Sequence, residues 1–403
     1  MNYEFCCPTL FGLEGIVGDE LRYGGKLDDV RVENGHVCFS GNEETLIWAN
    51  LWLRCAERVL ITVGSFEAHS FEELFDGVYE LPWLDYIEKD YAFPVKGYSL
   101  SSDLHSIPDC QSIIKKAIVK SLSEAYGVEW FEETGPRCQI QFSIMNNKVT
   151  LYLDTSGAGL HKRGYRANAN AAPLRETLAA GLIKLSRYHG RGDFLDPFCG
   201  SGTIPIEAAM IAQNRAPGMM RGFDAEKWEW IPQELWRQAR ENALDAVYHD
   251  RAYQIFGSDL DESCITLSEE NARKAGVDHL ISFSQADACA LDLRNREGTL
   301  ICNPPYGERL MDLRSAQQLV RKFGTVASNS PMKQYIITSD EDFEKFYGVK
   351  ADKKRKVYNG MLRCNVYMYF QNPHNRKKIQ QNFSRDKRAN SYKKRRKDQR
   401  IDP

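Results

Sequence analysis

The first part of the chain alternates short hydrophobic blocks with polar residues in a pattern that predicts a small α+β module. Residues 15–22 and 45–56 have helical periodicity, and residues 30–39 predict two strands. The dipeptide Asn34-Gly35 between these strands is typical of a hairpin turn. This order of strands and helices, up to about residue 66, predicts a split βαβ module.

A second module is predicted over residues 70–155. Its pattern indicates helices at 71–75 and 110–125, an aromatic strand at 91–95, and two closing strands at 139–144 and 148–154. Residues 145–147, Met-Asn-Asn, would form the turn between the closing strands. This region shows no grouping of catalytic side chains, which favours recognition over chemistry.

Beyond about residue 161 the pattern changes to strands that alternate with helices. A helix is predicted over residues 171–182, with Pro173 near its start, where a missing N–H costs nothing. Strands at 194–196, 254–259, 281–287 and 299–302 are then separated by helical segments, one of them at 203–212. This alternation predicts an α/β domain built on a parallel sheet.

Composition places the chain among ordinary globular proteins. Its 403 residues call for two or three domains, and 42% hydrophobic with 27% charged residues argues against overall disorder. The sequence shows no membrane-spanning run or signal peptide, so we expect a cytoplasmic protein without membrane partners. Eleven cysteines without Cys-x-x-Cys spacing, among them Cys38, Cys302 and Cys364, are interpreted as small core residues, and no metal site is expected.

Charge is distributed unevenly along the chain. Residues 371–403 contain twelve Lys and Arg against three Asp, a net charge of +9, whereas the whole chain has −2. Such a basic stretch with hardly any apolar residue is typical of a disordered tail attracted to nucleic acid. A role in solubility alone is the alternative.

The most informative motif is Asn303-Pro304-Pro305-Tyr306, which closes the predicted strand 299–302. An exocyclic amine on a nucleobase is a weak nucleophile because its lone pair is delocalised into the ring. The side-chain carbonyl of Asn303 and the backbone carbonyl of Pro304 could accept both of its N–H groups and orient the lone pair toward an incoming methyl group. Tyr306 offers a flat face for stacking the base.

Acidic residues follow the other predicted strands. Asp196 precedes a loop containing Gly200 and Gly202, and it could accept a hydrogen bond from a ligand ammonium group. Asp259 could bind a ribose diol and Asp287 an adenine amino group, because ligands of such sheets gather where the strands end. Asp261 is the alternative ribose ligand, or else it caps the next helix.

These motifs together resemble those of a known enzyme family. The segments 196–203, 257–261, 285–288 and 303–309 are similar to motifs I to IV of class I S-adenosylmethionine-dependent methyltransferases that methylate amino groups. The segments 161–166 and 172–180 resemble the subfamily with an N-terminal THUMP domain, above all the bacterial 23S rRNA guanine-N2 methyltransferases. The likeness covers nearly the whole chain except the basic tail.

The resemblance implies a domain arrangement and a substrate. It implies a ferredoxin-like module (1–65), a THUMP RNA-binding domain (66–160), a Rossmann-like transferase domain (161–375) and the basic tail (376–403). It further implies an enzyme that uses S-adenosylmethionine to methylate the N2 amine of a guanine, with 23S rRNA as the expected partner.

The same resemblance assigns roles to single residues. Asn303, Pro304 and Tyr306 would hold the target amine. The cofactor would be bound by residues of the strand ends, the glycine loop and the preceding helix, namely Asp196, Phe198, Gly200, Gly202, Thr203, Thr177, Asp259, Asp287 and Asn303. Basic residues of the second module and of the following segment are candidate RNA contacts, namely Lys115, Lys116, Lys162, Arg163 and Arg166.

Other functions stay open at the level of sequence. The Asn-Pro-Pro-Tyr motif suits adenine N6 in DNA or RNA and a glutamine amide as well as guanine N2. Cys302 beside the motif could suggest a cysteine nucleophile for pyrimidine C5 methylation, but its place in an apolar strand favours packing. A non-catalytic RNA-binding protein would be expected to have lost Asn303 or the glycine loop, and both are present.

Overall fold

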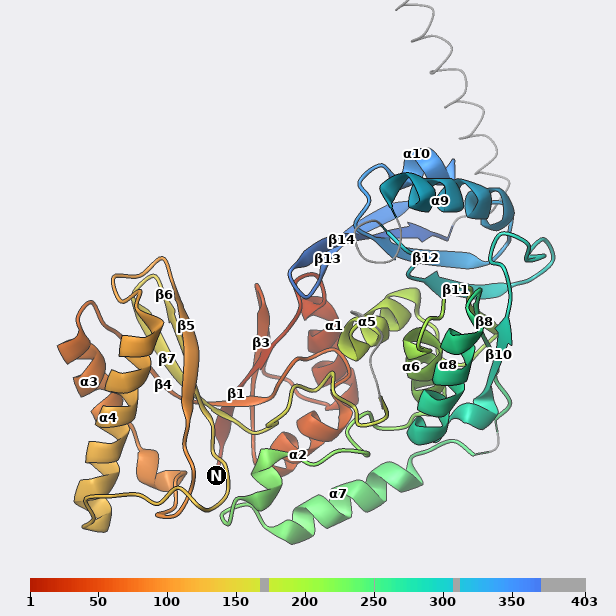
Figure 1. Cartoon of the computed structure of the whole chain (residues 1–403). Helices are drawn as coiled ribbons and strands as arrows, with labels where there is room; N and C mark the ends of the chain where they lie inside the picture. The colour runs from red at the N-terminus through yellow and green to blue at the C-terminus, as the bar shows by residue number, and fades with distance from the viewer. Residues whose placement is uncertain (167–173, 250, 307–311, 371–403) are drawn as a thin grey trace, which may run out of the picture. The chain divides into compact units, whose positions relative to one another are not determined.

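The computed structural model describes residues 1–166, 174–249, 251–306 and 312–370 (Figure 1). Contacts within the chain divide it into two compact units: residues 1–164 with 215–247, and residues 165–214 with 248–403. The predicted basic tail, residues 376–403, lies outside the described residues. None of the described helices has the length and hydrophobicity needed to cross a membrane.

Unit 1 is built on a seven-stranded sheet of order β2-β3-β1-β4-β7-β6-β5. Its strands are β1 (Tyr3–Pro8), β2 (Val30–Glu33), β3 (His36–Gly41), β4 (Leu60–Glu67), β5 (Val95–Leu100), β6 (Ile140–Met145) and β7 (Lys148–Asp154). Its helices are α1 (Glu14–Asp19), a π-helical turn (Glu20–Gly24), α2 (Glu43–Trp52), α3 (Phe71–Tyr79), α4 (Ile107–Tyr126), α7 (Gln233–Asp245) and the 3₁₀ turns Trp83–Asp85 and Asp224–Lys227. Pairing of β4 with β7 joins the two predicted modules into one sheet.

Most elements predicted in this unit are confirmed. The β2–β3 hairpin turns at Asn34-Gly35, and both Asn146 and Asn147 adopt the positive φ that a tight turn between β6 and β7 requires. The strand predicted at residues 91–95 is wrong, because β5 begins only at Val95. The backbone N–H of Phe93 donates instead to the carboxylate of Glu133, which replaces a strand partner.

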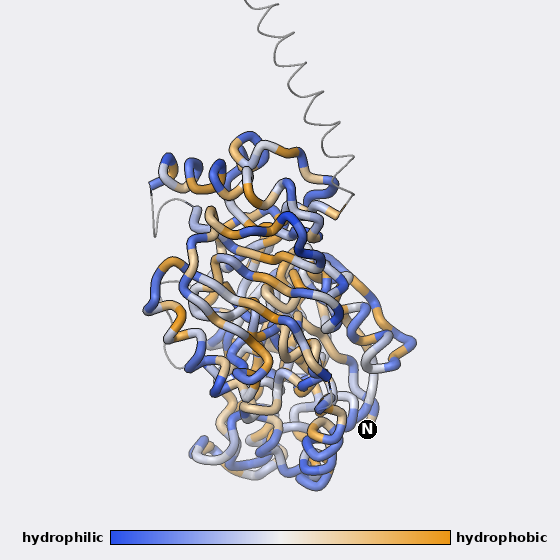
Figure 2. The backbone as a smooth tube through the Cα atoms, turned by 90° about the vertical axis from the view of Figure 1, so that its right-hand side faces the viewer, coloured by the Kyte–Doolittle hydropathy of each residue, from blue (hydrophilic) through white to orange (hydrophobic). Residues whose placement is uncertain are grey.

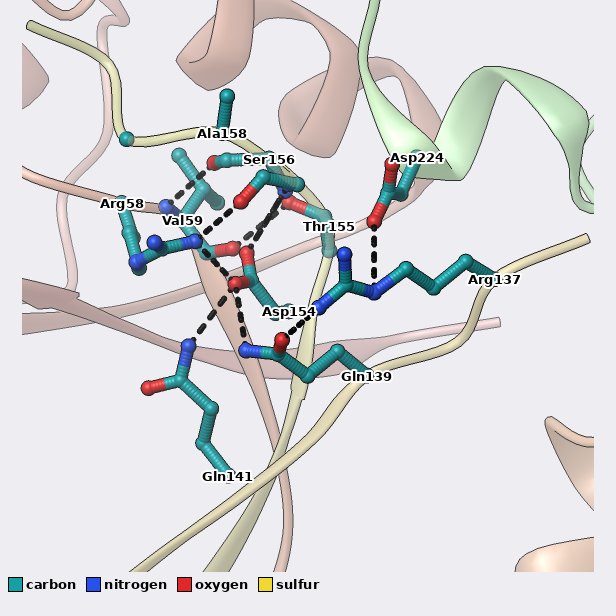
Figure 3. Close-up of polar contacts among 12 residues, drawn as sticks. Arg58, Val59, Arg137, Gln139, Gln141, Asp154, Thr155, Ser156, Ala158 and Asp224 are labelled. Atoms are coloured by element: carbon teal, nitrogen blue, oxygen red, sulfur yellow. Dashed lines mark hydrogen bonds and ion pairs between the residues drawn. The ribbon is translucent and has the colours of Figure 1, made fainter. Parts of the chain in front are cut away.

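A buried carboxylate organises the end of β7 (Figure 3). Asp154 is fully buried, and its oxygens accept hydrogen bonds from the backbone N–H of Ser156 (3.0 Å) and from Gln141 (2.8 Å). The guanidinium of Arg58 forms an ion pair with the same side chain. Charge and hydrogen bonds together offset the cost of burying this carboxylate.

Residues 215–247 belong to unit 1 although the chain has already entered the transferase region. The indole N–H of Trp228 donates to the Arg137 carbonyl (2.9 Å), and that of Trp230 donates to the Tyr86 carbonyl (3.2 Å). Helix α7 packs on α2. We did not foresee this grouping, because it depends on partners about ninety residues or more away in the sequence. The domain boundaries expected from the sequence stay a prediction.

Unit 2 contains a second seven-stranded sheet, of order β10-β9-β8-β11-β12-β14-β13. Its strands are β8 (Asp193–Asp196), β9 (Gln254–Asp259), β10 (Ile281–Gln285), β11 (Gly298–Cys302), β12 (Lys333–Thr338), β13 (Lys353–Asn359) and β14 (Leu362–Tyr369). Its helices are α5 (Glu176–Ser186), α6 (Thr203–Ala212), α8 (Glu262–Ala275), α9 (Leu313–Ala327), α10 (Phe343–Tyr347) and the 3₁₀ turn Asp278–Leu280. Strands β8 to β12 are parallel, and β14 is antiparallel to both of its neighbours.

Helices cover both faces of this sheet, which confirms the predicted α/β class. α5, α6 and α8 pack on one face, whereas α9 contributes Val320 and Phe323 to a core on the other face that includes Cys302 (Figure 1). Hydrophobic and hydrophilic residues alternate along the helices and strands in Figure 2. The chain goes outward from β8 to β9 and β10 and then returns to β11 on the opposite side of β8, so the sheet has its switch point between β8 and β11.

Eight of the eleven cysteines interpreted as core residues are buried, Cys302 and Cys364 among them. Cys38, Cys264 and Cys289 are only partly buried, and the prediction is wrong for these three; of them, Cys38 has the most distinctive surroundings. It pairs across the strands with Cys6 and lies beside His36, and both interactions lower the pKa of the Cys38 thiol to about 5. Such a thiol is a reactive group rather than an inert packing residue.

Candidate active site

The polar residues predicted from the strand ends gather at one edge of the unit 2 sheet. Asp196 and Asp259 are the last residues of the neighbouring parallel strands β8 and β9. Asn303 follows β11, which lies on the other side of β8. The switch point of the sheet thus falls between Asp196 and Asn303, where ligands of doubly wound sheets bind.

Asp196 has an unused hydrogen-bonding atom. The residue is 1% exposed, and its Oδ1 accepts from the Phe198 backbone N–H (3.1 Å). Its Oδ2 is buried and has no hydrogen-bond partner among the described residues. Burial raises the pKa of this carboxyl well above 3.8, and the charge of Asp259 adds to the rise. A cationic ligand group would satisfy the orphaned oxygen and restore the charged form.

The glycine loop has one open side and one packed side. A Cβ built on Gly200, which has a φ of +53°, would meet no atom of the described residues within 4 Å. On Gly202, with a φ of +78°, a Cβ would lie 3.0 Å from the Cβ of Ser268 in α8. Gly202 is therefore needed for helix packing, whereas the space in front of Gly200 is free for a ligand.

Helix α8 holds this loop in place. Ser268 donates its hydroxyl to the Gly200 carbonyl (2.8 Å), and Asn271 donates its amide to the Ser201 carbonyl (3.0 Å). Our sequence analysis missed both residues. The available signal was a pair of polar residues three positions apart on a helix whose other inward positions are apolar.

Asp259 is oriented by the backbone. Its Oδ2 accepts from the Gly200 N–H (3.0 Å) and its Oδ1 from the Asp261 N–H (3.1 Å). The residue is half-exposed, and each oxygen keeps a second lone pair for a ligand hydroxyl. Asp261 caps α8 by accepting from the Ser263 N–H (2.8 Å), which is the alternative role considered for it.

Asp287 lies two residues beyond β10 and is exposed. Its Oδ1 accepts from the Cys289 backbone N–H (2.8 Å) and so stabilises the following turn. One oxygen is left for a ligand, but this residue is less committed to a site than Asp196 or Asp259.

The Asn303 motif also contains an orphaned oxygen. Asn303 Oδ1 is buried without a hydrogen-bond partner among the described residues, and Pro304 is buried behind it. Tyr306 is half-buried and hydrogen-bonds with the Cys364 thiol of β14. An amide oxygen held in a proline-stiffened segment is suited to accept an N–H of a ligand.

The remaining predicted cofactor residues support the loop. Thr203 is buried at the first position of α6 and accepts a hydrogen bond from Arg166 (2.8 Å), while Thr177 is buried in the first turn of α5. Arg166 also pairs with Glu176 (3.0 Å), so it connects the starts of the two helices. The ring of Phe198 packs edge-on against Phe323, and Phe198 contributes its backbone N–H rather than its ring to Asp196.

Three of the predicted RNA contacts need correction. Lys115 binds the Glu133 carboxylate and the Phe93 carbonyl, and Arg163 is 2% exposed with its guanidinium on the Leu160 carbonyl. Arg163 is therefore buried, and Lys115, which is 30% exposed, is engaged by internal partners. Arg166 is committed to Thr203 and Glu176, as described above.

Lys116 and Lys162 are exposed and stay candidate RNA contacts. Both lie in unit 1, Lys116 in α4 and Lys162 in the segment that leads toward unit 2.

One group in the described part of the chain has the donors and spacing for a metal ion. The ligand atoms of Cys6, His36 and Cys38 in unit 1 all lie within 4.8 Å of one another. Their nitrogen and sulfur donors suit zinc. The group belongs to β1 and β3, and none of its residues takes part in the site at the unit 2 sheet.

Comparison with known protein families identifies all three parts of the chain. Residues 4–60 match the RlmL ferredoxin-like domain, residues 68–154 the THUMP domain, and residues 163–368 the RMKL-like methyltransferase domain. The chain belongs to the RMKL-like methyltransferase family. The family's transferase match spans the strands β8 to β12 and thus the whole edge that carries Asp196, Asp259 and Asn303.

Two relatives of this RMKL-like methyltransferase extend over most of it. The "Putative RNA methyltransferase YpsC" of Bacillus subtilis (strain 168) is 41% identical over 92% of the chain and 96% of its own length. The "Ribosomal RNA large subunit methyltransferase K/L" of Psychromonas ingrahamii is 35% identical over 91% of the chain. The chain spans about half the length of that second relative, 50%.

Solved structures agree with this assignment. A "predicted N6-adenine-specific DNA methylase" from Listeria monocytogenes is 45% identical, with a TM-score of 0.86 over 92% of the chain and 96% of its own. A "putative methyltransferase complexed with SAH" is 41% identical, also with a TM-score of 0.86, over 92% of the chain and 98% of its own. The cofactor of this RMKL-like methyltransferase is S-adenosylmethionine, and the orphaned Asp196 oxygen and the open space at Gly200 fit its methionine part.

Proposed function

We propose that this chain methylates the exocyclic N2 amine of a guanine in 23S rRNA. The observation that carries the proposal is the buried, unpartnered Oδ1 of Asn303 at the same sheet edge as the unpartnered Oδ2 of Asp196. Two orphaned acceptors on either side of the switch point suit two different donors. These are the cofactor's ammonium group and the target amine.

Each residue has a role that follows from its chemistry. Bound S-adenosylmethionine supplies an electrophilic methyl group on a sulfonium. Asn303 Oδ1 and the Pro304 carbonyl accept the two N–H groups of the target amine, so that its lone pair points away from the ring toward the methyl carbon. Tyr306 stacks on the base, and its bond to Cys364 keeps the ring oriented.

Asn303 acts as a hydrogen-bond acceptor and not as a base. An amide does not take up a proton near neutral pH. The nitrogen becomes strongly acidic once it carries the new methyl group, and its proton then passes to water. No residue with a pKa near 7 is therefore required at this position.

The N-terminal half favours RNA as the substrate. The THUMP and RlmL ferredoxin-like matches precede the transferase, and the K/L relative is named for the RNA of the large ribosomal subunit. Since the chain spans about half of that relative, we assign to it only the chemistry of the part that is matched.

Adenine-N6 methylation is the second candidate. The similar protein from Listeria monocytogenes is named a predicted N6-adenine-specific DNA methylase. An adenine amine has the same planar N–H₂ group, and the acceptors of Asn303 and Pro304 would suit it equally.

The test is direct. We expect the protein to transfer labelled methyl groups from S-adenosylmethionine to protein-free large-subunit rRNA, with N2-methylguanosine found by mass spectrometry after nuclease digestion. N6-methyladenosine in RNA, or labelled DNA in a parallel reaction, would establish the second candidate instead. Asn303→Ala should lower kcat by about a hundredfold or more at unchanged cofactor affinity. Asn242→Ala, on an exposed position of α7, is the matched control.

A further inference from the structure

The hairpin formed by β13 and β14 extends past the sheet at the edge that carries the active site. β14 is antiparallel to β12, and its Asn365 pairs with Thr338, the last residue of β12. Residues 361–364 thus continue beyond the end of β12 for roughly 13 Å, at about 3.3 Å per residue. β12 is parallel to β11, so the hairpin leaves the sheet on the same side as Asn303.

The base of the hairpin touches the catalytic motif. Cys364, the third residue of β14, hydrogen-bonds with Tyr306. Burial raises the pKa of this thiol, and the hydrogen bond from Tyr306 opposes the rise. The hairpin therefore borders the place where a target base would stack on Tyr306.

The tip of the hairpin presents an apolar side chain to solvent. Asn359 pairs with Leu362, which leaves a two-residue turn, and Gly360 takes the positive φ of +64° that its first position needs. Met361 is 99% exposed and Leu362 44%. Single exposed apolar residues are ordinary, but this one stands on the tight turn of a hairpin whose base borders the catalytic motif.

Cations flank this tip. β13 begins with four consecutive basic residues, 353–356, of which Lys356 is nearest to the turn. Lys354 pairs with Glu344 (2.5 Å), whereas Lys356 is exposed and makes no ion pair with a described residue. On β14, Arg363 is about half exposed, with Glu341 at 3.8 Å.

Lysines on an edge strand also discourage pairing between sheets of different molecules. That explanation applies equally to Lys353 and to Lys356, since both are exposed on β13. A role in binding a ligand at the active-site edge would instead depend on the distance from the tip. The two residues carry the same charge at different distances from the tip and on opposite faces of β13, so they form a pair for an experiment.

We propose that the β13–β14 hairpin is an RNA-docking element that keeps the target nucleotide out of its stack. Met361 inserts beside the neighbouring bases in place of the extruded one, and Lys356 and Arg363 bind the flanking phosphates. The inference rests on the proposed RNA methyltransferase function. Methionine is among the side chains that proteins insert between base steps, and lysine and arginine supply phosphate contacts.

The first test addresses the insertion of Met361. Once wild-type protein has identified the methylated nucleotide, a short RNA with that guanine in a paired stem and 2-aminopurine beside it is prepared. Wild-type binding should increase the 2-aminopurine fluorescence, and Met361→Ala should lose the increase and lower kcat by about tenfold, since unstacking is then uncompensated. Met361→Leu should retain both.

A change in the RNA substrate should compensate for the loss of the Met361 side chain. With the target guanine in an unpaired loop, Met361→Ala should recover to within about twofold of wild type, because no stack has to be opened. Leu244→Ala, at another exposed apolar position, is the control that should leave all values unchanged. An equal loss on paired and unpaired RNA would overturn the insertion role.

The second test addresses the cations. Lys356→Glu should raise KM for RNA by about tenfold and reduce the slope of log affinity against log salt by roughly one. Lys353→Glu, the same charge change farther from the tip, should have little effect. Equal effects of both variants would overturn a specific docking role and leave general attraction between charges.

Different results would contradict the RNA methyltransferase function and the docking role of the hairpin. Methylation of RNA by the wild type together with an unaffected Met361→Ala variant would overturn this inference alone. A wild type that binds S-adenosylmethionine but methylates no RNA would overturn the proposed function and the inference together.

Discussion

Each of the two units buries an aspartate, but the two carboxylates differ in how many hydrogen-bond donors surround them. Asp154 of unit 1 is surrounded by donors, including Arg58, Gln141 and the Ser156 N–H. Asp196 of unit 2 accepts one backbone hydrogen bond, and its second oxygen has no partner among the described residues. Burial is the first cause of a raised pKa in both.

The difference is the one expected between a structural carboxylate and a carboxylate that binds a ligand. In unit 1 the fold itself satisfies the charge, so Asp154 stabilises the end of β7. In unit 2 the Oδ2 of Asp196 is buried without a partner among the described residues, and a ligand with a donor group would satisfy it. The same substitution, Asp to Asn, should therefore have opposite consequences at the two positions.

Asp196→Asn should have the largest effect on cofactor binding. We expect the Kd for S-adenosylmethionine to rise by about a hundredfold to a thousandfold, because the buried ammonium group would lose its counter-charge. The free energy of unfolding of the cofactor-free protein should rise, since a neutral amide costs less to bury than a carboxylate. Calorimetric titration and denaturant unfolding measure the two quantities. Unchanged affinity would remove Asp196 from the cofactor site.

Asp154→Asn should show the reverse. Its amide N–H₂ would face other donors and leave Arg58 without its counter-charge, so the free energy of unfolding should fall by about 2 kcal/mol. Cofactor affinity should stay within about twofold of wild type, because the network belongs to unit 1 and the candidate cofactor residues belong to unit 2. A loss of affinity as large as that of Asp196→Asn would show that the comparison does not separate structure from binding.

The strand-end positions of the polar residues in unit 2 could be predicted from the sequence, whereas the network around Asp154 in unit 1 could not. Asp196, Asp259 and Asn303 each follow a hydrophobic run by a fixed offset, and such local patterns survive folding because parallel strands end at one edge. The unpartnered oxygens of Asp196 and Asn303 could not be predicted, because they depend on which hydrogen-bond donors the folded chain places nearby.

Burial of charged side chains was not predictable from local pattern. Lys115 and Arg163 have polar neighbours in the sequence. Their partners, the Glu133 carboxylate and the Leu160 carbonyl, are brought into contact by the path of the folded chain, which the sequence pattern does not show. Unit 1 also includes residues 215–247, whose hydrogen bonds to Tyr86 and Arg137 join parts of the chain that are distant in the sequence.

The pH dependence of cofactor binding sharpens the comparison further. Burial raises the pKa of Asp196, so protons compete with the ammonium group at higher pH than for an ordinary carboxyl of pKa 3.8. Affinity should be constant above the raised pKa and fall by up to about tenfold per pH unit below it. Asp196→Asn should give a flat profile. A wild-type profile as flat as that of the variant would contradict the assignment.

The smallest predicted effect concerns Cys38 of unit 1. Its pKa is lowered, whereas the pKa of each buried aspartate is raised. Hydrogen bonding with Cys6 and the nearby His36 lower its pKa to about 5, whereas burial raises the pKa of Cys264 in unit 2. Cys38 therefore ionises at lower pH than Cys264.

This difference can be measured by alkylation with iodoacetamide at pH 6.5, with the labelled sites mapped by mass spectrometry. A thiolate of low pKa is intrinsically less nucleophilic, which cancels much of its advantage, so we expect Cys38 to react only about fivefold faster than Cys264. His36→Ala should reduce the ratio, because the thiolate loses the neighbour that stabilises it. Equal rates at the two cysteines would contradict the lowered pKa of the Cys38 thiol.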